Sequence, residues 1–141
     1  MKKPGKFLQL FFHQYYKTRY NINTKVIGNE GENKALEFLL QNGYELLHKN
    51  WRTRFGEIDI IVKKDNLIVF VEVKSLPKGN LDYLSKVLNK DKQERIIKTS
   101  KRFLLNNRQY SNSYIRYDVI VIDMPGMSEV YHIENAFMEL L

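Results

Sequence analysis

The sequence predicts an α/β fold with a mixed central sheet flanked by helices. Short runs rich in isoleucine and valine, at 58–62 and 67–73, are bounded by polar turn residues, as is typical of strands. Two longer segments, near 29–42 and 90–106, repeat apolar residues every three or four positions, as amphipathic helices do. The elements follow one another in the order αβββαβ, which favours one sheet with helices packed against it.

Length and composition predict one domain, at 27–141, preceded by a basic, aromatic-rich arm at 1–26. A chain of 141 residues can bury a core without disulfides, and the lack of cysteine excludes a thiolate zinc site. No apolar run approaches the ~20 residues that cross a bilayer. The apolar stretch near the start stops at His13 without a small-residue cleavage site. We therefore expect a cytoplasmic protein with no membrane partner.

The net charge of +7 is unevenly distributed. Basic residues are concentrated in the arm and in 74–108, whereas 28–73 between them is acidic. Basic flanks around an acidic centre suit a protein that gathers a cation and binds nucleic acid. A basic surface that serves solubility is the alternative explanation of the charge alone. We expect the aromatic residues of the arm to pack on the domain or a partner, with stacking on unpaired bases as the alternative.

The first helix is predicted from Asn29 to Asn42. Asn29 is a good N-cap, Glu32 lies three residues later as in a capping box, and Gly43 ends the helix. Glu32 shares the apolar face with Ala35, so its carboxylate is directed toward the sheet. The residues alone leave a capping role and a functional role for Glu32 equally open.

A strand at 44–50 and a hairpin with strands at 56–63 and 67–75 follow. Charged residues interrupt the apolar hairpin strands at Asp59, Glu72 and Lys74. Side chains alternate along a strand, so Glu72 and Lys74 share a face, and in ordinary register Asp59 meets Glu72 at one end. Two carboxylates bind Mg²⁺ or Mn²⁺ well, and a neighbouring lysine can orient water. A structural ion pair is the alternative, but the spacing of Asp59 favours a metal site.

The connection between the first two strands supplies candidate nucleic-acid contacts. Trp51, Arg52 and Arg54 are expected to stack on or clamp nucleic acid, although packing is the favoured role for Trp51. Gly56 marks a bend that admits a substrate backbone. Glu57 shares the face of Asp59, and a solvated edge position is favoured over a second acid at the site.

The second helix is predicted from Lys90 to Asn106 with Asn89 as its cap. Lys92 and Arg95 lie three positions apart on its polar edge, where they can reach a phosphate or remain solvated. The segment 77–89 before this helix is expected to be a linker.

Two further strands are predicted at 115–123 and 130–133. We expect Asp118 beside Arg116 to be a structural pair. His48 and His132 lack metal-ligand spacing and are expected to be ordinary strand-end residues.

The spacing Asp59-(x12)-Glu72-x-Lys74 resembles the PD-(D/E)xK nuclease superfamily. The wider pattern resembles one family within it, the YraN-like UPF0102 proteins, predicted endonucleases related to Holliday junction resolvases. The resemblance covers residue 27 to the C-terminus. The matching residues are Gly28–Glu32, Ala35, Gly43, Tyr44, Asn50–Arg52, Gly56–Ile61, Val69–Lys74, Lys92, Arg95, Ile96, Arg116–Val119, His132, Ile133 and Asn135–Phe137.

This resemblance implies a restriction-endonuclease-like core and a Mg²⁺- or Mn²⁺-dependent endodeoxyribonuclease. Asp59, Glu72 and the Val73 carbonyl would hold the metal, and Glu32 would complete its shell or orient a water. Lys74 would position the attacking water, and Lys92 would hold a phosphate. The implied partner is DNA, branched or single-stranded, and a homodimer would supply two sites for two symmetric strands.

One residue departs from the family pattern. The family usually carries an arginine two positions after the lysine, where this chain has Leu76. The departure favours an alternative, a non-catalytic nucleic-acid-binding accessory module. A structural protein with a membrane-surface arm is a third alternative, based on the basic, aromatic N-terminus.

Overall fold

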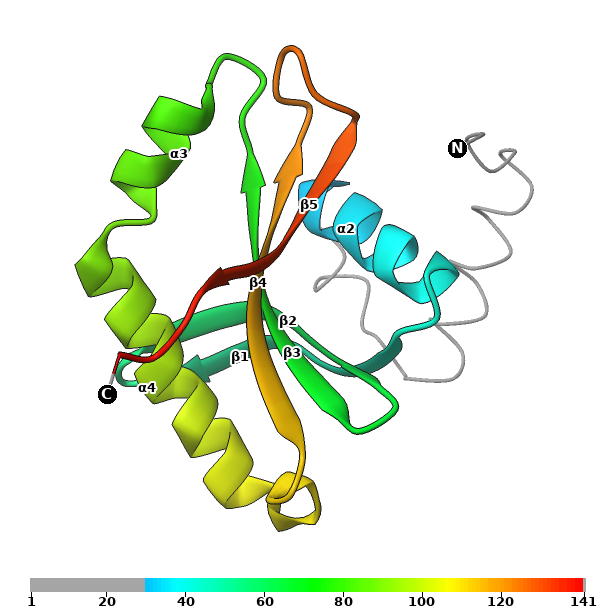
Figure 1. Ribbon diagram of the computed structural model, residues 1–141, viewed down its shortest axis with the longest axis vertical. Helices are drawn as coiled ribbons and strands as arrows, with labels where there is room; N and C mark the ends of the chain where they lie inside the picture. The colour runs from blue at the N-terminus through cyan, green and yellow to red at the C-terminus, as the bar shows by residue number, and fades with distance from the viewer. Residues whose placement is uncertain (1–29, 141) are drawn as a thin grey trace.

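The computed structural model describes residues 30–140, which form a five-stranded sheet with helices on both faces (Figure 1). The strands lie in the order β1-β2-β3-β4-β5; β3 and β4 are parallel, and the other neighbours are antiparallel. The predicted mixed sheet flanked by helices is therefore confirmed. The elements are α2 (Glu30–Gln41), β1 (Glu45–Thr53), β2 (Gly56–Lys64), β3 (Leu67–Ser75), α3 (Leu81–Val87), α4 (Lys90–Asn106), the 3-10 helix η2 (Arg108–Tyr110), β4 (Tyr114–Ile122) and β5 (Val130–Phe137).

Connection length explains the topology. Short turns join β1, β2 and β3, so these strands run antiparallel. Asp65 takes a left-handed conformation (φ 51°) in the β2–β3 turn, which aspartate tolerates better than most residues. The chain then crosses over through α3 and α4 before β4, and a crossover of this length returns the strand parallel to β3.

Each face of the sheet has its own apolar core. Helix α2 packs on one face, and α3 and α4 pack on the other (Figure 1). The inner strands are buried from both sides, which is why β2, β3 and β4 read as nearly continuous apolar runs instead of alternating ones. The α2 core centres on Leu39, Ile60, Val69 and Ile120; the α4 core centres on Ile58, Phe70, Ile96, Phe103 and Val119.

The helix ends follow the predicted capping residues where the structure describes them. The Asn89 side chain accepts a hydrogen bond from the Lys92 N–H at 3.0 Å and so caps α4. Helix α2 ends before Gly43, whose φ of 87° favours glycine. The proposed Asn29 cap and the arm predicted at 1–26 lie outside the described residues. No helix within 30–140 is long and apolar enough to cross a membrane.

The predicted order αβββαβ is incomplete. The segment 77–89, expected to be a linker, contains helix α3, capped by the Asn80 side chain on the Tyr83 N–H at 2.9 Å. Only Leu84 of this helix is buried, so its sequence carries almost no apolar periodicity. Strand β5 was predicted to end at residue 133 and instead continues to Phe137.

A buried ion network joins β4 to β5. The Arg116 guanidinium donates two hydrogen bonds of 2.8 Å to the Asp118 carboxylate, so the predicted structural pair is confirmed. The ring Nε2 of His132 lies 2.7 Å from Asp118 Oδ2, and the Asn135 N–H donates to Oδ1 at 2.9 Å. The expectation that His132 is an ordinary strand-end residue is therefore wrong. Burial alone would raise the pKa of Asp118, but these hydrogen bonds outweigh it and lower the pKa.

Candidate metal site at the open end of the β2–β3 hairpin

The proposed site lies where β2 and β3 separate. Backbone pairing between these strands ends at Ile60 and Val71, whereas β3 stays paired with β4 as far as Ser75. Beyond the last pair, Asp59 Oδ2 accepts a hydrogen bond from the Val73 N–H at 2.8 Å. The Val73 N–H thus bonds to the Asp59 side chain in place of a backbone carbonyl of β2, and the two strands separate from this point.

Glu72 is the most buried carboxylate at this opening, with 5% of its surface exposed. Its Oε1 lies 3.4 Å from Lys74 Nζ on the same strand and 3.5 Å from Lys92 Nζ on α4. Lys92 comes from the first turn of α4, the turn that Asn89 caps. The sheet and α4 therefore bring the three predicted residues Glu72, Lys74 and Lys92 together.

Helix α2 contributes Glu32 from its first turn. Burial raises the pKa of Glu32, and the negative charges of Glu57 and Glu72 raise it further. The positive charge of Lys49 and a hydrogen bond from the Asn50 side chain act in the opposite direction. Glu32 thus belongs to the same electrostatic cluster, although it lies about 40 residues from Glu72 in the sequence. We call Glu32, Glu57, Asp59 and Glu72 the acidic site.

Asp59 responds most strongly to this environment. Burial raises its pKa from 3.8 to about 7, and the charge on Glu72 is the next largest cause. The hydrogen bond from Val73 lowers the pKa, while Glu32 and Glu57 raise it. Within residues 30–140 the Val73 N–H is the one hydrogen-bond donor to this carboxylate. Hydrogen bonds therefore stabilise the ionised Asp59 carboxylate only weakly.

A further charged residue near the site, Lys49 on β1, was missed from the sequence. Its Nζ donates a hydrogen bond to Asn33 Oδ1 on α2 at 2.9 Å. Burial lowers the pKa of Lys49, and the charges of Glu32 and Asp59 partly restore it. A register shift between residues 46 and 48 disturbs the alternation of β1, so the direction of Lys49 cannot be read from the strand pattern.

The predicted arginines lie on the surface around the hairpin. Arg52 Nε donates to Glu57 Oε2 at 2.9 Å, which makes Glu57 half of an edge ion pair as well as a charge near Asp59. Arg95 is exposed on α4 and Arg54 is exposed in the β1–β2 turn. Arg52 thus contacts the outermost acid of the site, and within residues 30–140 no ion pair joins Arg54 or Arg95 to any of its acids.

Trp51 has a packing role. Its ring lies edge-on to Phe103 of α4, with centroids 5.3 Å apart, and to His48, with centroids 5.2 Å apart. The side chain is half-buried against the α4 core. This arrangement favours the packing alternative over stacking on nucleic acid.

The position at which the resemblance implies an arginine is filled by a core residue. Leu76 is buried in the α4 core, and its N–H donates to the Ile122 carbonyl at 2.9 Å. Other basic residues near it are directed elsewhere: Lys86 pairs with Asp82, and Lys78 lies on the surface. In the described part of the chain, neither lysine pairs with an acidic residue of the site.

The donor atoms suit a hard divalent cation. No three His, Cys, Asp or Glu side chains within 30–140 lie close enough to enclose an ion as they stand. The charge on Glu72 nevertheless raises the pKa of Asp59, so the two carboxylates interact electrostatically. The N–H and C=O of a strand residue face the same neighbour, so the Val73 carbonyl faces Asp59 as well. Carboxylate and carbonyl oxygens are ligands that fit Mg²⁺ or Mn²⁺.

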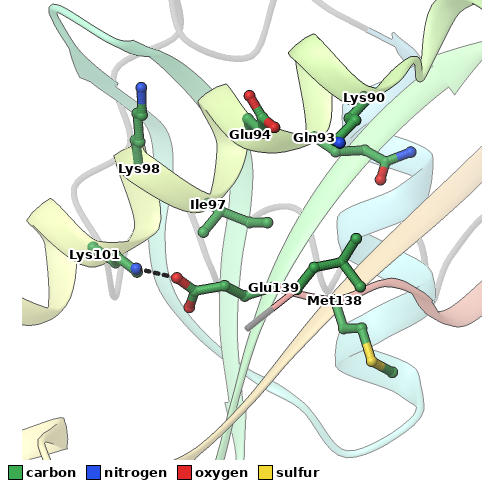
Figure 2. A pocket seen from close by; sticks show the side chains of 9 residues that line it. Lys90, Gln93, Glu94, Ile97, Lys98, Lys101, Met138 and Glu139 are labelled. Atoms are coloured by element: carbon green, nitrogen blue, oxygen red, sulfur yellow. Dashed lines mark hydrogen bonds and ion pairs between the residues drawn. The ribbon is translucent and has the colours of Figure 1, made fainter.

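A separate groove of about 320 Å³ lies between α4 and the C-terminal segment (Figure 2). Lys101 reaches across it to pair with Glu139. No residue of the acidic site lines it; its lining residues are Lys90, Gln93, Glu94, Ile97, Lys98, Lys101, Met138, Glu139 and Leu140. The groove is thus on a different flank of α4 from Lys92.

Comparison with known sequences identifies the family. Residues 31–122 match the uncharacterised protein family UPF0102. This chain belongs to the UPF0102 family. A UPF0102 protein of Treponema denticola is 47% identical over 122 residues, which cover 79% of this chain and 94% of that protein. One from Caldicellulosiruptor saccharolyticus is 40% identical over 119 residues, 82% of this chain and 100% of its own. One from Persephonella marina is 41% identical over 110 residues, which cover 78% of this chain and 91% of that protein.

The UPF0102 match includes the whole acidic site. It begins one residue before Glu32, contains the hairpin with Asp59 and Glu72, and ends at Ile122, the last residue of β4. Strand β5, with His132, follows the matched range.

Proposed function

We propose that this UPF0102 protein is a metal-dependent endonuclease that hydrolyses phosphodiester bonds of DNA with Mg²⁺ or Mn²⁺. The observation that carries the proposal is the electrostatic interaction of Asp59 and Glu72 where β2 and β3 separate, with two lysines on Glu72. Burying several like charges is costly, so stability alone gives no reason for this arrangement. The PD-(D/E)xK resemblance and a restriction-endonuclease-like core are part of the same proposal.

Asp59, Glu72 and the Val73 carbonyl would hold the metal. When bound, a divalent ion supplies Lewis-acid polarisation of a phosphate oxygen and lowers the pKa of a nearby water. The protein contributes the carboxylate oxygens of Asp59 and Glu72, two side chains whose positions are fixed by the sheet. Backbone pairing between β2 and β3 ends at Ile60 and Val71, and the substrate phosphate would lie at this open end of the hairpin.

The lysines and Glu32 would act on the reacting groups. Lys74 orients the attacking water and stabilises negative charge on the phosphate oxygens, and Lys92 holds a phosphate from α4. Because burial raises the pKa of Glu32, its carboxylate is a stronger base than a free glutamate and can accept the proton of that water. The water oxygen bonds to phosphorus as the bond to the sugar oxygen breaks, and that oxygen takes a proton from solvent.

Basic residues around the site would bind the DNA backbone. Arg52, Arg54 and Arg95 are exposed beside the hairpin, where they can neutralise phosphates and release counterions. The expectation of branched DNA rests on the resemblance to Holliday junction resolvases. Cutting two symmetric strands of a junction would require a homodimer.

A second candidate is a nucleic-acid-binding accessory module without turnover. Leu76 favours it, because a buried leucine stands where the family usually has an arginine. In this case the protein would bind DNA without hydrolysing it.

A cleavage assay with isosteric variants separates the two candidates. Labelled linear duplex, flap, single-stranded and four-way-junction DNA are incubated with Mg²⁺ or Mn²⁺, and chelator provides the blank. Glu72→Gln and Lys74→Met remove one charge each at nearly constant volume, and we expect each to reduce cleavage by about 10²-fold or more. Lys86→Met is the matched control, because it removes an exposed lysine that pairs with Asp82.

Equal cleavage by wild type, Glu72→Gln and Lys74→Met would contradict the proposed site. DNA binding by folded wild type without cleavage of any substrate would favour the accessory module. Equal affinity for a junction and a linear duplex at matched salt would remove the branched-DNA expectation alone.

A further inference from the structure

The turn between β1 and β2 presents an aromatic ring and a guanidinium together. Phe55 is 37% exposed, and the Arg54 guanidinium carbon lies 4.9 Å from the centre of its ring. The Phe55 N–H donates to Thr53 Oγ1 at 3.1 Å, which ties the turn to the end of β1. Phe55 belongs to neither apolar core of residues 30–140, so its exposed edge is available to a ligand.

This turn is held against α4 beside the acidic site. A Cβ on Gly56 would lie 3.5 Å from Thr99 Oγ1 and 3.8 Å from Arg95 Cβ, so backbone and helix are in close contact there. Figure 1 shows the β1–β2 hairpin reaching toward α4. Asp59 lies four residues after Phe55, so at about 3.3 Å per strand residue their Cα atoms are at most roughly 13 Å apart.

Phe55 differs from the other exposed aromatic residues. Tyr83 on α3 and Tyr114 at the start of β4 are more exposed, but neither lies on the hairpin that carries Asp59. Within residues 30–140, Arg54 and Phe55 form the one cation–π pair in which both partners are exposed. A ring with a planar cation beside it is the arrangement on which nucleobases stack.

We propose that Arg54 and Phe55 stack on an unpaired nucleobase of the DNA strand whose backbone enters the acidic site. The inference rests on the proposed function and adds the feature of DNA that the site selects. Bases of a continuous duplex are stacked on one another, so their faces cannot meet the ring. Arg95 lies against Gly56 next to the turn and Arg52 pairs with Glu57, so both exposed guanidinium groups are close enough to the turn to neutralise phosphates of the same strand.

Binding in chelator tests the stacking without cleavage. The full chain is titrated into labelled single-stranded DNA and duplex of equal length at fixed salt, with anisotropy as the readout and 2-aminopurine quenching as the direct signal of stacking. We expect Phe55→Ala to weaken single-strand binding about 5- to 150-fold and duplex binding less than twofold. Phe55→Trp should retain binding and quenching. Tyr114→Ala is the matched control, an exposed ring at a distant strand end.

Several outcomes would overturn the inference. Equal losses for single strand and duplex, or a Phe55→Ala variant that binds as Tyr114→Ala does, would show that the ring selects nothing. Wild type that cleaves DNA while Phe55→Ala binds normally removes the stacking and leaves the nuclease. Stacking without any cleavage supports the stacking and removes the nuclease. Wild type that binds no DNA removes both.

Discussion

Neutralising Asp59 should stabilise the metal-free protein at pH 8. The pKa of Asp59 lies at about 7 in the folded protein against 3.8 for a free aspartate, a difference that corresponds to about 4 kcal/mol. In Asp59→Asn the amide oxygen can still accept the hydrogen bond from the Val73 N–H, while the charge that burial and Glu72 oppose is gone. We therefore expect a free energy of unfolding up to about 4 kcal/mol higher than that of wild type.

The sign and the pH range follow from the direction of the shift. Because the pKa of Asp59 is higher in the folded state, the folded protein retains the proton that the unfolded chain loses. The associated stability is complete below about pH 4 and is lost as the pH rises through about 7. Urea denaturation in chelator at pH 4, 6 and 8 should thus show wild type and Asp59→Asn equal at pH 4 and increasingly different above it.

Asp82→Asn is the matched control, because it also removes one carboxylate but from an exposed pair with Lys86. Its effect should stay within about 0.5 kcal/mol at every pH. Added Mg²⁺ should stabilise wild type and not Asp59→Asn if the carboxylate holds the ion. An Asp59→Asn variant less stable than wild type at pH 8, or a difference that does not change with pH, would refute the electrostatic reasoning.

Two other predictions concern stability. Asp118→Asn should lower the free energy of unfolding by about 3 kcal/mol, because Arg116 loses its buried counter-charge, whereas Asp123→Asn at the surface should change it by less than about 0.5 kcal/mol. Folding lowers the pKa of Asp118, so its contribution to stability is present above about pH 4 and is lost below it. Thermal melts of wild type and Asp118→Asn at pH 3 and pH 7 check the size of the effect and its pH dependence. Gly56→Ala should cost about 1–3 kcal/mol, because φ at this glycine is 153°, and an unchanged denaturation midpoint would contradict that.

The hairpin and its two acids could be predicted because the signals are local. Strands β2 and β3 are rich in β-branched residues and joined by a polar turn, so their register follows from the turn. Asp59 and Glu72 are conspicuous because they interrupt apolar runs. Arg116 and Asp118 are two positions apart on one strand, so their pairing follows from alternation alone.

The missed features depend on contacts between distant segments. Lys49 enters the site after a register shift in β1, and His132 meets Asp118 across a second shift, between residues 117 and 119 of β4. A shift of one residue reverses the face of every side chain after it, and nothing in a single sequence marks where it occurs. Helix α3 was missed because Leu84 is its only buried residue.

The two buried aspartates, Asp118 and Asp59, differ in how the surrounding residues compensate their charge. Asp118 is also buried, but three groups donate to it, and folding lowers its pKa. Asp59 has one donor within the described residues and three carboxylates around it, and folding raises its pKa to about 7. The first acid stabilises the sheet, whereas the second destabilises the protein once it ionises. If the proposed metal ion binds, its positive charge would offset that cost.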